Sequence, residues 1–241
     1  IPQWTGNQAG PRTALRSHST PIEAGNMSCT LQIPMVPVQL VRSMLQGSVG
    51  VSWSPDGRHL IYHTLNNDTG RDIWYLSLDG DGEPQPFLET PDEETVPQFS
   101  PDGRHVAYTS NETGQFEVYI TTFPDKEARQ VVPAGGGVWP RWNPAGDELF
   151  YVEPRPQGNR LMVAPISLLP AIRPGIPRPV FEIDEIGVAL ESFMGYSTAV
   201  PYDVRDNGQR FMMVQNIEAD DEKPSITVVE NWYADFKDKH P

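Results

Sequence analysis

Short apolar segments and polar turns alternate along residues 51–241, and one arrangement of them returns four times. In each copy a bulky apolar residue precedes a turn of the Pro-Asp-Gly type, and a second apolar segment follows the turn. The copies are VSWSPDGRHLIYHT (51–64), PQFSPDGRHVAYTS (97–110), PRWNPAGDELFYVE (140–153) and YDVRDNGQRFMMVQ (202–215). Their turn glycines, Gly57, Gly103, Gly146 and Gly208, are spaced by 46, 43 and 62 residues. A repeat of this length indicates one supersecondary unit per copy.

Each unit is predicted to contain four strands. Proline presets φ, Asp or Asn accepts a local hydrogen bond and glycine adopts φ > 0, so the two apolar segments form an antiparallel hairpin. Third strands are predicted at Asp72–Leu78, Phe116–Thr122, Arg160–Ile166 and Ser225–Asn231, and fourth strands at Gln85–Glu89, Arg129–Val132 and Arg178–Ile183. Four strands in about 45 residues are typical of a propeller blade.

The sequence therefore predicts an all-β propeller of about four to five four-stranded antiparallel blades, which can be part of a larger propeller. Two stacked sheets are the alternative, and the constant register of the copies argues against them. Residues 51–241 form the blades, and residues 1–50 form an irregular N-terminal arm. The last copy is short of a strand, and Cys29–Leu45 is the candidate to supply it and close the ring. Without closure, open blade edges would favour self-association.

Composition and charge limit the kinds of partner that this chain can bind. The formal net charge of -14 repels phosphate backbones, which excludes nucleic acid. Cys29 is the single cysteine and the five histidines lack metal-ligand spacing, so no metal and no cofactor are predicted. No stretch approaches the roughly 20 apolar residues of a membrane span. The start at Ile1 is typical of a mature or truncated piece of a longer protein.

The turn motifs WSPDG and FSPDG, each followed by an apolar strand, resemble the TolB-like group of WD-repeat-like propellers. SNETGQFEVYITTFP, GGGVWPRWNPAGDELFYV, YDVRDNGQRFMMV and TVVENWYADF resemble more closely the propellers attached to bacterial serine/threonine kinases and related regulators. The likeness covers residues 51–236. It implies a sensor, a scaffold or the propeller half of a serine peptidase, in a periplasmic or extracellular location, and it leaves a cytoplasmic location open. Such propellers usually have six or more blades.

Signals for catalysis are weak. The segment GYSTA (195–199) lacks the final glycine of a nucleophile elbow, so a loop serine is expected there. His59 and His105 follow their turn glycines by two residues and are expected to be solvated. The acidic run Asp92-Glu93-Glu94 is either a solvated turn or a source of carboxylates for cation binding or acid–base chemistry.

Loop topology predicts one binding mouth. The loops between blades and the loops between second and third strands gather at the same end of a propeller, and here they are Thr90–Val96, Ala134–Trp139, Ile186–Tyr202, Asn66–Arg71, Asn111–Gln115 and Pro154–Arg160. The predicted ligand contacts are Trp139, Arg141, Phe193 and Tyr196, because aromatic side chains offer large contact areas and arginine a polar handle. Alternatively, Phe193 and Met194 plug the channel.

The distance from each turn glycine also shows which residues of the inner strands are equivalent between copies. Five residues before each glycine, Ser52, Gln98, Arg141 and Asp203 occupy equivalent positions. Arg141 and Asp203 belong to successive copies, so they either pair across a blade interface or contact a ligand.

These observations predict a ligand- or protein-binding propeller module, the extracytoplasmic sensor or interaction part of a larger bacterial protein. Its expected partner is a small molecule, a glycan, or a protein or peptide at the channel mouth. The alternative is a hydrolase, a glycosidase or esterase, that uses carboxylates at that mouth. The candidate carboxylates are Glu93, Glu94, Glu191 and Asp203.

Overall fold

The computed structural model describes residues 48–79, 82–184, 200, 202–214 and 226–230. The chain forms two units, residues 1–35 and 36–241, and every described residue belongs to the second. The predicted N-terminal arm up to residue 47, including the candidate closing strand Cys29–Leu45, lies outside the described residues. The first strand begins at Ser48, inside the range predicted for the arm.

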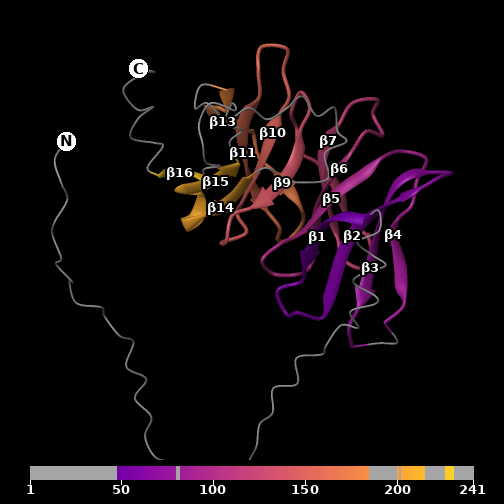
Figure 1. Cartoon of the computed structure of the whole chain (residues 1–241). Coiled ribbons are helices and arrows are strands. Elements are labelled where there is room, and N and C mark those ends of the chain that lie inside the picture. Colours follow the sequence, from indigo (N-terminus) through magenta and orange to yellow (C-terminus); the bar gives the residue numbers. More distant parts are fainter. Residues whose placement is uncertain (1–47, 80–81, 185–199, 201, 215–225, 231–241) are drawn as a thin grey trace, which may run out of the picture. The chain divides into compact units, whose positions relative to one another are not determined.

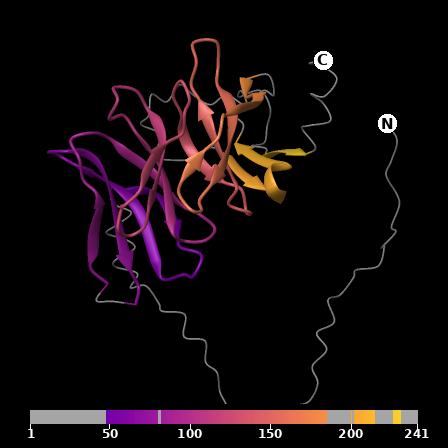
Figure 2. The ribbon, with the colours of Figure 1, turned by 180° about the vertical axis from the view of Figure 1, so that it is seen from behind.

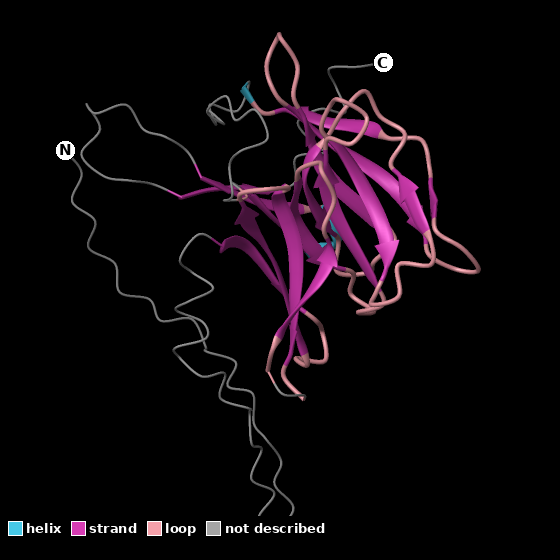
Figure 3. Ribbon diagram, turned by 90° about the vertical axis from the view of Figure 1, so that its right-hand side faces the viewer, coloured by secondary structure: helices cyan, strands magenta, loops and turns pink. Residues whose placement is uncertain are grey.

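The described residues form four antiparallel sheets, called blades 1 to 4 in chain order (Figure 1). Blade 1 contains β1 (Ser48–Trp53), β2 (His59–Asn66), β3 (Gly70–Ser77) and β4 (Pro84–Leu88). Blade 2 contains β5 (Glu94–Phe99), β6 (His105–Ser110), β7 (Glu117–Thr122) and β8 (Arg129–Val131). Blade 3 contains β9 (Val138–Trp142), β10 (Glu148–Glu153) and β11 (Arg160–Ser167), with β12 (Arg173–Pro174) and β13 (Arg178–Glu182) both paired to β11. Blade 4 contains β14 (Tyr202–Arg205), β15 (Arg210–Val214) and β16 (Ile226–Glu230). The prediction of an all-β propeller fold with antiparallel blades is confirmed (Figure 3); blades 1 and 2 have the expected four strands, blade 3 has five and the described part of blade 4 has three.

The repeated turn is held by a serine and an aspartate. In blade 2 the Ser100 hydroxyl donates to Asp102 Oδ1 at 2.5 Å and accepts the backbone N–H of His105 at 3.1 Å. Blade 1 repeats the hydroxyl–carboxylate bond between Ser54 and Asp56 at 2.6 Å. These bonds and the positive φ of Gly57 and Gly103 explain why the inner strands of blades 1 and 2 reverse into the second strands.

His105 corrects one expectation. It is buried rather than solvated, with its Nδ1 3.4 Å from Asp102 Oδ1. Every residue of β6 is buried, because blades 1 and 3 flank blade 2. The neighbouring Ser100, Asp102 and His105 thus form the turn itself. The Ser100 hydroxyl bonds the Asp102 carboxylate and the His105 backbone but not the imidazole ring, so the arrangement does not activate a nucleophile.

Replacing Ser100 with alanine is expected to lower the free energy of unfolding by about 1–3 kcal/mol, because the buried His105 N–H loses its hydroxyl acceptor. Urea denaturation measures the change. Ser167→Ala is the control, since its hydroxyl bonds the Leu169 carbonyl at an exposed position. Equal stability of the two variants would contradict this account of the turn.

Successive blades pack face to face, β1 to β3 against β5, β5 to β7 against β9, and β9 against β14 (Figures 1 and 2). The residue four positions before each turn glycine points to the preceding blade. Phe99, Trp142 and Val204 are buried there, whereas Trp53 is 52% exposed. Trp53 differs because the described part of the chain contains no blade that precedes blade 1.

Candidate functional site

The inner strands of blades 2 and 3 begin with a backbone bulge. Val96 and Trp139 occupy equivalent positions and have φ values of 51° and 58°. The Val96 N–H donates to His63 Nδ1 at 3.2 Å, and the Trp139 N–H donates to Thr109 Oγ1 at 3.3 Å. In both cases the acceptor belongs to the preceding blade. The bulge therefore links successive blades by a hydrogen bond.

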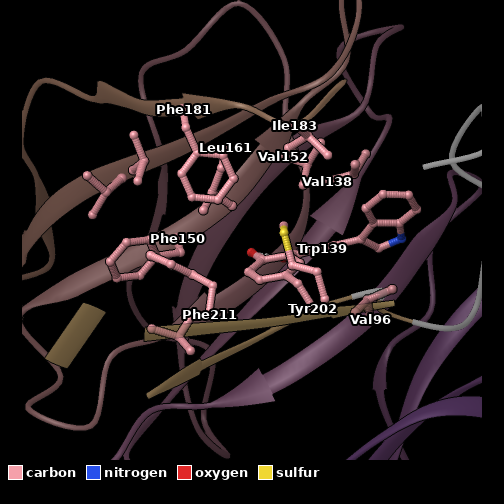
Figure 4. Close-up of a cluster of buried hydrophobic side chains, with 14 residues drawn as sticks. Val96, Val138, Trp139, Phe150, Val152, Leu161, Phe181, Ile183, Tyr202 and Phe211 are labelled. Atoms are coloured by element: carbon pink, nitrogen blue, oxygen red, sulfur yellow. Dashed lines mark hydrogen bonds between the residues drawn. The ribbon is translucent and has the colours of Figure 1, made fainter. Parts of the chain in front are cut away.

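Trp139 lies in this bulge and is buried. Its side chain is 4% exposed and lies in a hydrophobic cluster with residues such as Phe150, Leu161 and Phe211, and its carbonyl accepts the Tyr202 hydroxyl at 2.8 Å (Figure 4). Trp139 was predicted to contact a ligand at the mouth. The structure places its side chain in this buried cluster, which contains residues of blades 2, 3 and 4. Phe193, Tyr196 and Glu191 lie outside the described residues, as does most of the Ile186–Tyr202 loop.

Some of the predicted mouth loops do meet. Arg71 Nη1 lies 3.1 Å from Glu93 Oε2, and the Glu93 N–H donates to Asn111 Oδ1 at 2.8 Å. Three loops from blades 1 and 2 are thereby held together. The carboxylate of Glu93 is used in this contact, which fits a structural role better than a catalytic one.

Glu94 is the most perturbed carboxyl group of the described chain. It is 2% exposed, its Oε1 accepts the Thr90 hydroxyl at 2.5 Å, and its Oε2 has no hydrogen-bond partner. Burial raises its pKa to about 7; the Thr90 hydrogen bond opposes this shift, and Asp72 and Asp92 add to it. Such a group can hold a proton near neutral pH, but its burial keeps a substrate away. No group of three or more His, Cys, Asp or Glu among the described residues is placed to hold a metal ion.

A pocket of about 420 Å³ lies at the opposite end of the inner strands, next to the repeated turns. All four described blades contribute an inner-strand residue to its wall: Val51, Gln98, Arg141 and Asp203. The turns add Pro55, Pro101 and Pro144. Gln98, Arg141 and Asp203 each lie five positions before a turn glycine, so the sequence alone shows that they are equivalent. The three prolines are equivalent in the same way, two positions before a turn glycine, but only packing shows that all these residues surround a pocket.

Arg141 carries the charge of this pocket. Its guanidinium is largely buried, and Nη1 has no hydrogen-bond partner in the described part of the chain. Burial lowers the pKa of Arg141, and the nearby Tyr202 and Asp203 act in the opposite direction. An arginine remains protonated in a protein even so. Arg141 thus places a positive charge in the pocket wall, and its Nη1 is a buried donor without a partner among the described residues.

The ion pair between Arg141 and Asp203, one of the two alternatives raised by the sequence, is not formed. Asp203 Oδ2 lies 3.0 Å from Arg205 Nη2, and no carboxylate among the described residues pairs with Arg141. Both Arg141 and Asp203 line the pocket. The two residues are therefore separate parts of one pocket wall.

Comparison with known proteins identifies the fold. No protein-family model matches the sequence. An uncharacterized protein from Agrobacterium fabrum strain C58 is 28% identical over 101 residues, which are 42% of this chain and 34% of that protein. The crystal structure of TolB from Acinetobacter baumannii matches 76% of this chain with a TM-score of 0.55 at 15% identity. The chain has a TolB-like β-propeller fold.

A second solved structure, an oligogalacturonate lyase in complex with manganese, shares the TolB-like fold with a TM-score of 0.51 at 15% identity over 76% of this chain. The match spans 40% of the TolB chain and 48% of the lyase chain, so this TolB-like chain corresponds to less than half of either. Such identity concerns the fold alone, and the likeness to kinase-attached propellers stays a prediction. Among the described residues, no helix has the length and hydropathy that crossing a membrane requires.

Proposed function

We propose that this TolB-like propeller is a binding module whose pocket holds a ligand carboxylate on Arg141. The observation that carries the proposal is the buried guanidinium whose Nη1 has no partner beside a pocket of about 420 Å³. A buried donor without an acceptor costs free energy, and more so when it is charged. Carboxylate geometry matches the guanidinium fork, so a bound carboxylate would recover that cost with two parallel hydrogen bonds.

The surroundings favour a monoanionic group. The pocket volume lies within the roughly 300–1,000 Å³ range of small-molecule sites. Asp203 lines the same pocket, and the chain has a formal net charge of -14, so a phosphate or another multiply charged anion would meet more repulsion than a single carboxylate. A small molecule, an acidic sugar or the terminus of a peptide can supply such a group.

The hydrolase alternative receives less support. A glycosidase needs two carboxyl groups roughly 5–9.5 Å apart that face a pocket. Among the described lining residues of this pocket Asp203 is the one carboxylate, whereas Glu93 pairs with Arg71 and Glu94 is buried at the other end of the inner strands. Glu191 lies outside the described residues. An extracytoplasmic sensor role is compatible with the binding module and belongs to the same proposal.

Isothermal titration calorimetry tests the proposal with matched neutral and carboxylate probes. N-acetyl-L-phenylalanine is compared with its primary amide, and D-galacturonate with D-galactose. At least one carboxylate is expected to bind roughly tenfold or more tightly than its neutral partner, and Arg141→Gln is expected to abolish that difference.

Two further variants make the result specific. Arg141→Lys keeps the positive charge and loses the fork, so intermediate affinity is expected. Arg173→Gln removes an exposed arginine of β12 and should bind as the native chain does. Equal binding of carboxylate and neutral probes, or no binding of either carboxylate at millimolar concentration, would refute the proposal.

A further inference from the structure

We infer that the pocket is built for a zwitterion, a small ligand that carries an ammonium group beside its carboxylate, as a free α-amino acid does. The inference rests on the proposed function, since it assigns the carboxylate to Arg141. It adds a second contact, between the ligand ammonium and Asp203. The inference follows from two opposite charges, Arg141 and Asp203, that line one pocket without pairing with each other.

The two charges come from equivalent positions of successive blades. Arg141 lies on β9 of blade 3 and Asp203 on β14 of blade 4, each five residues before its turn glycine. Repeat geometry therefore presents both side chains to the same space, and both line the pocket. The equivalent residue of blade 2, Gln98, is neutral, and its Nε2 donates to the Pro97 carbonyl at 2.8 Å. Opposite charges thus lie on two sides of one site with an uncharged third side.

Asp203 Oδ1 accepts the backbone N–H of Val204 at 3.0 Å and Oδ2 pairs with Arg205, so a ligand ammonium has to displace that pair. The ion pair of Asp203 with Arg205 lies on the surface, where the side chains are 42% and 68% exposed. Pairs of this kind contribute little because water solvates both partners and the side chains lose freedom in the pair. A ligand ammonium would replace Arg205 as the partner of Asp203 while the ligand carboxylate reaches Arg141.

The rest of the wall is uncharged and mixes apolar residues with the polar Gln98, Ser100 and Asn143. Val51, Pro55, Pro101 and Pro144 present no charge to the pocket. A dianion would be repelled by Asp203, and a simple cation would leave the Arg141 donor without an acceptor. A zwitterion satisfies both groups and has no net charge, so the acidic chain does not repel it.

Three derivatives of one amino acid separate the contributions of the two charges. L-Phenylalanine carries both, N-acetyl-L-phenylalanine carries the carboxylate alone, and L-phenylalaninamide carries the ammonium alone. Calorimetry with the native chain is expected to give at least tenfold tighter binding of L-phenylalanine than of either derivative. A parallel leucine series keeps the result independent of the side chain.

Variants assign each charge to its residue. Asp203→Asn is expected to make L-phenylalanine bind as weakly as its N-acetyl derivative, and Arg141→Gln to make it bind as weakly as its amide. Arg173→Gln is the unaffected control. Melting temperatures check that each variant folds, and Asp203→Ser replaces the asparagine variant if it does not.

The possible failures are distinguishable. If the N-acetyl derivatives bind as tightly as the free amino acids and still depend on Arg141, the zwitterion inference is wrong and the proposed carboxylate site stands. An unchanged preference for the free amino acid in Asp203→Asn would also overturn the inference. If no carboxylate of either series binds but D-galacturonate does, the inference alone fails; if D-galacturonate does not bind either, the inference fails together with the proposed function.

Discussion

Replacing Trp142 with alanine is expected to lower the free energy of unfolding by about 3–5 kcal/mol. The side chain is 9% exposed and packs against Ala107, Val118 and Ile120 of the preceding blade. Its Nε1 also donates to the Gln98 carbonyl at 3.3 Å. Truncation therefore removes a large apolar contact, opens a cavity between blades 2 and 3, and deletes a hydrogen bond across the interface.

The repeat supplies a matched control at Trp53, which has the same position in blade 1. Because Trp53 is 52% exposed, Trp53→Ala is expected to lower the free energy of unfolding by no more than about 1 kcal/mol. Urea denaturation followed by circular dichroism measures both variants. Similar losses at the two positions would show that blade 1 is covered as blade 3 is, contrary to the structure.

Glu94→Gln is expected to raise the free energy of unfolding by about 3 kcal/mol more at pH 8 than at pH 4.5. Burial raises the native pKa of Glu94 from 4.5 to about 7, so between these values the native chain holds a proton that the unfolded chain has lost. Stability from this group is complete below pH 4.5 and is lost as the pH rises through 7. Glutamine has no charge to bury and keeps the acceptor for the Thr90 hydroxyl, so it avoids the loss.

The comparison isolates Glu94 from its neighbours. His63 acts in the opposite direction, since burial lowers its pKa to about 4 and stability is lost as the pH falls from 6.5 through 4. Asp72, Asp92 and Arg71 also contribute to the electrostatics of this region. All four residues are the same in both proteins, so the difference between variant and native chain at each pH, measured by urea denaturation, reports Glu94. Glu89→Gln, at an exposed position, is the control. Parallel pH profiles for the native chain and Glu94→Gln would contradict the prediction.

Much of the fold could be predicted because each repeat carries its own register. The third strand of blade 3 was predicted at Arg160–Ile166 and is observed at Arg160–Ser167, and the fourth strand of blade 2 was predicted at Arg129–Val132 and is observed at Arg129–Val131. A proline, an acidic or amide residue and a glycine impose the reversal locally, so the strands on either side of the turn need no information from other blades. The distance from the turn glycine likewise showed that Gln98, Arg141 and Asp203 are equivalent positions, and the structure brings all three to one pocket.

By itself, then, the sequence determined the blades, their strands and the equivalence of positions between them. Only the tertiary structure decided how each position is used. Trp139 is buried among residues of blades 2, 3 and 4, and its backbone N–H donates to the Thr109 hydroxyl of the preceding blade. The described pocket lies beside the turns because the inner strands of all four described blades meet there. The pKa of Glu94 depends on burial between blades 1 and 2. Burial and charge depend on what the neighbouring blade presents, and a repeat pattern within one blade contains no information about that.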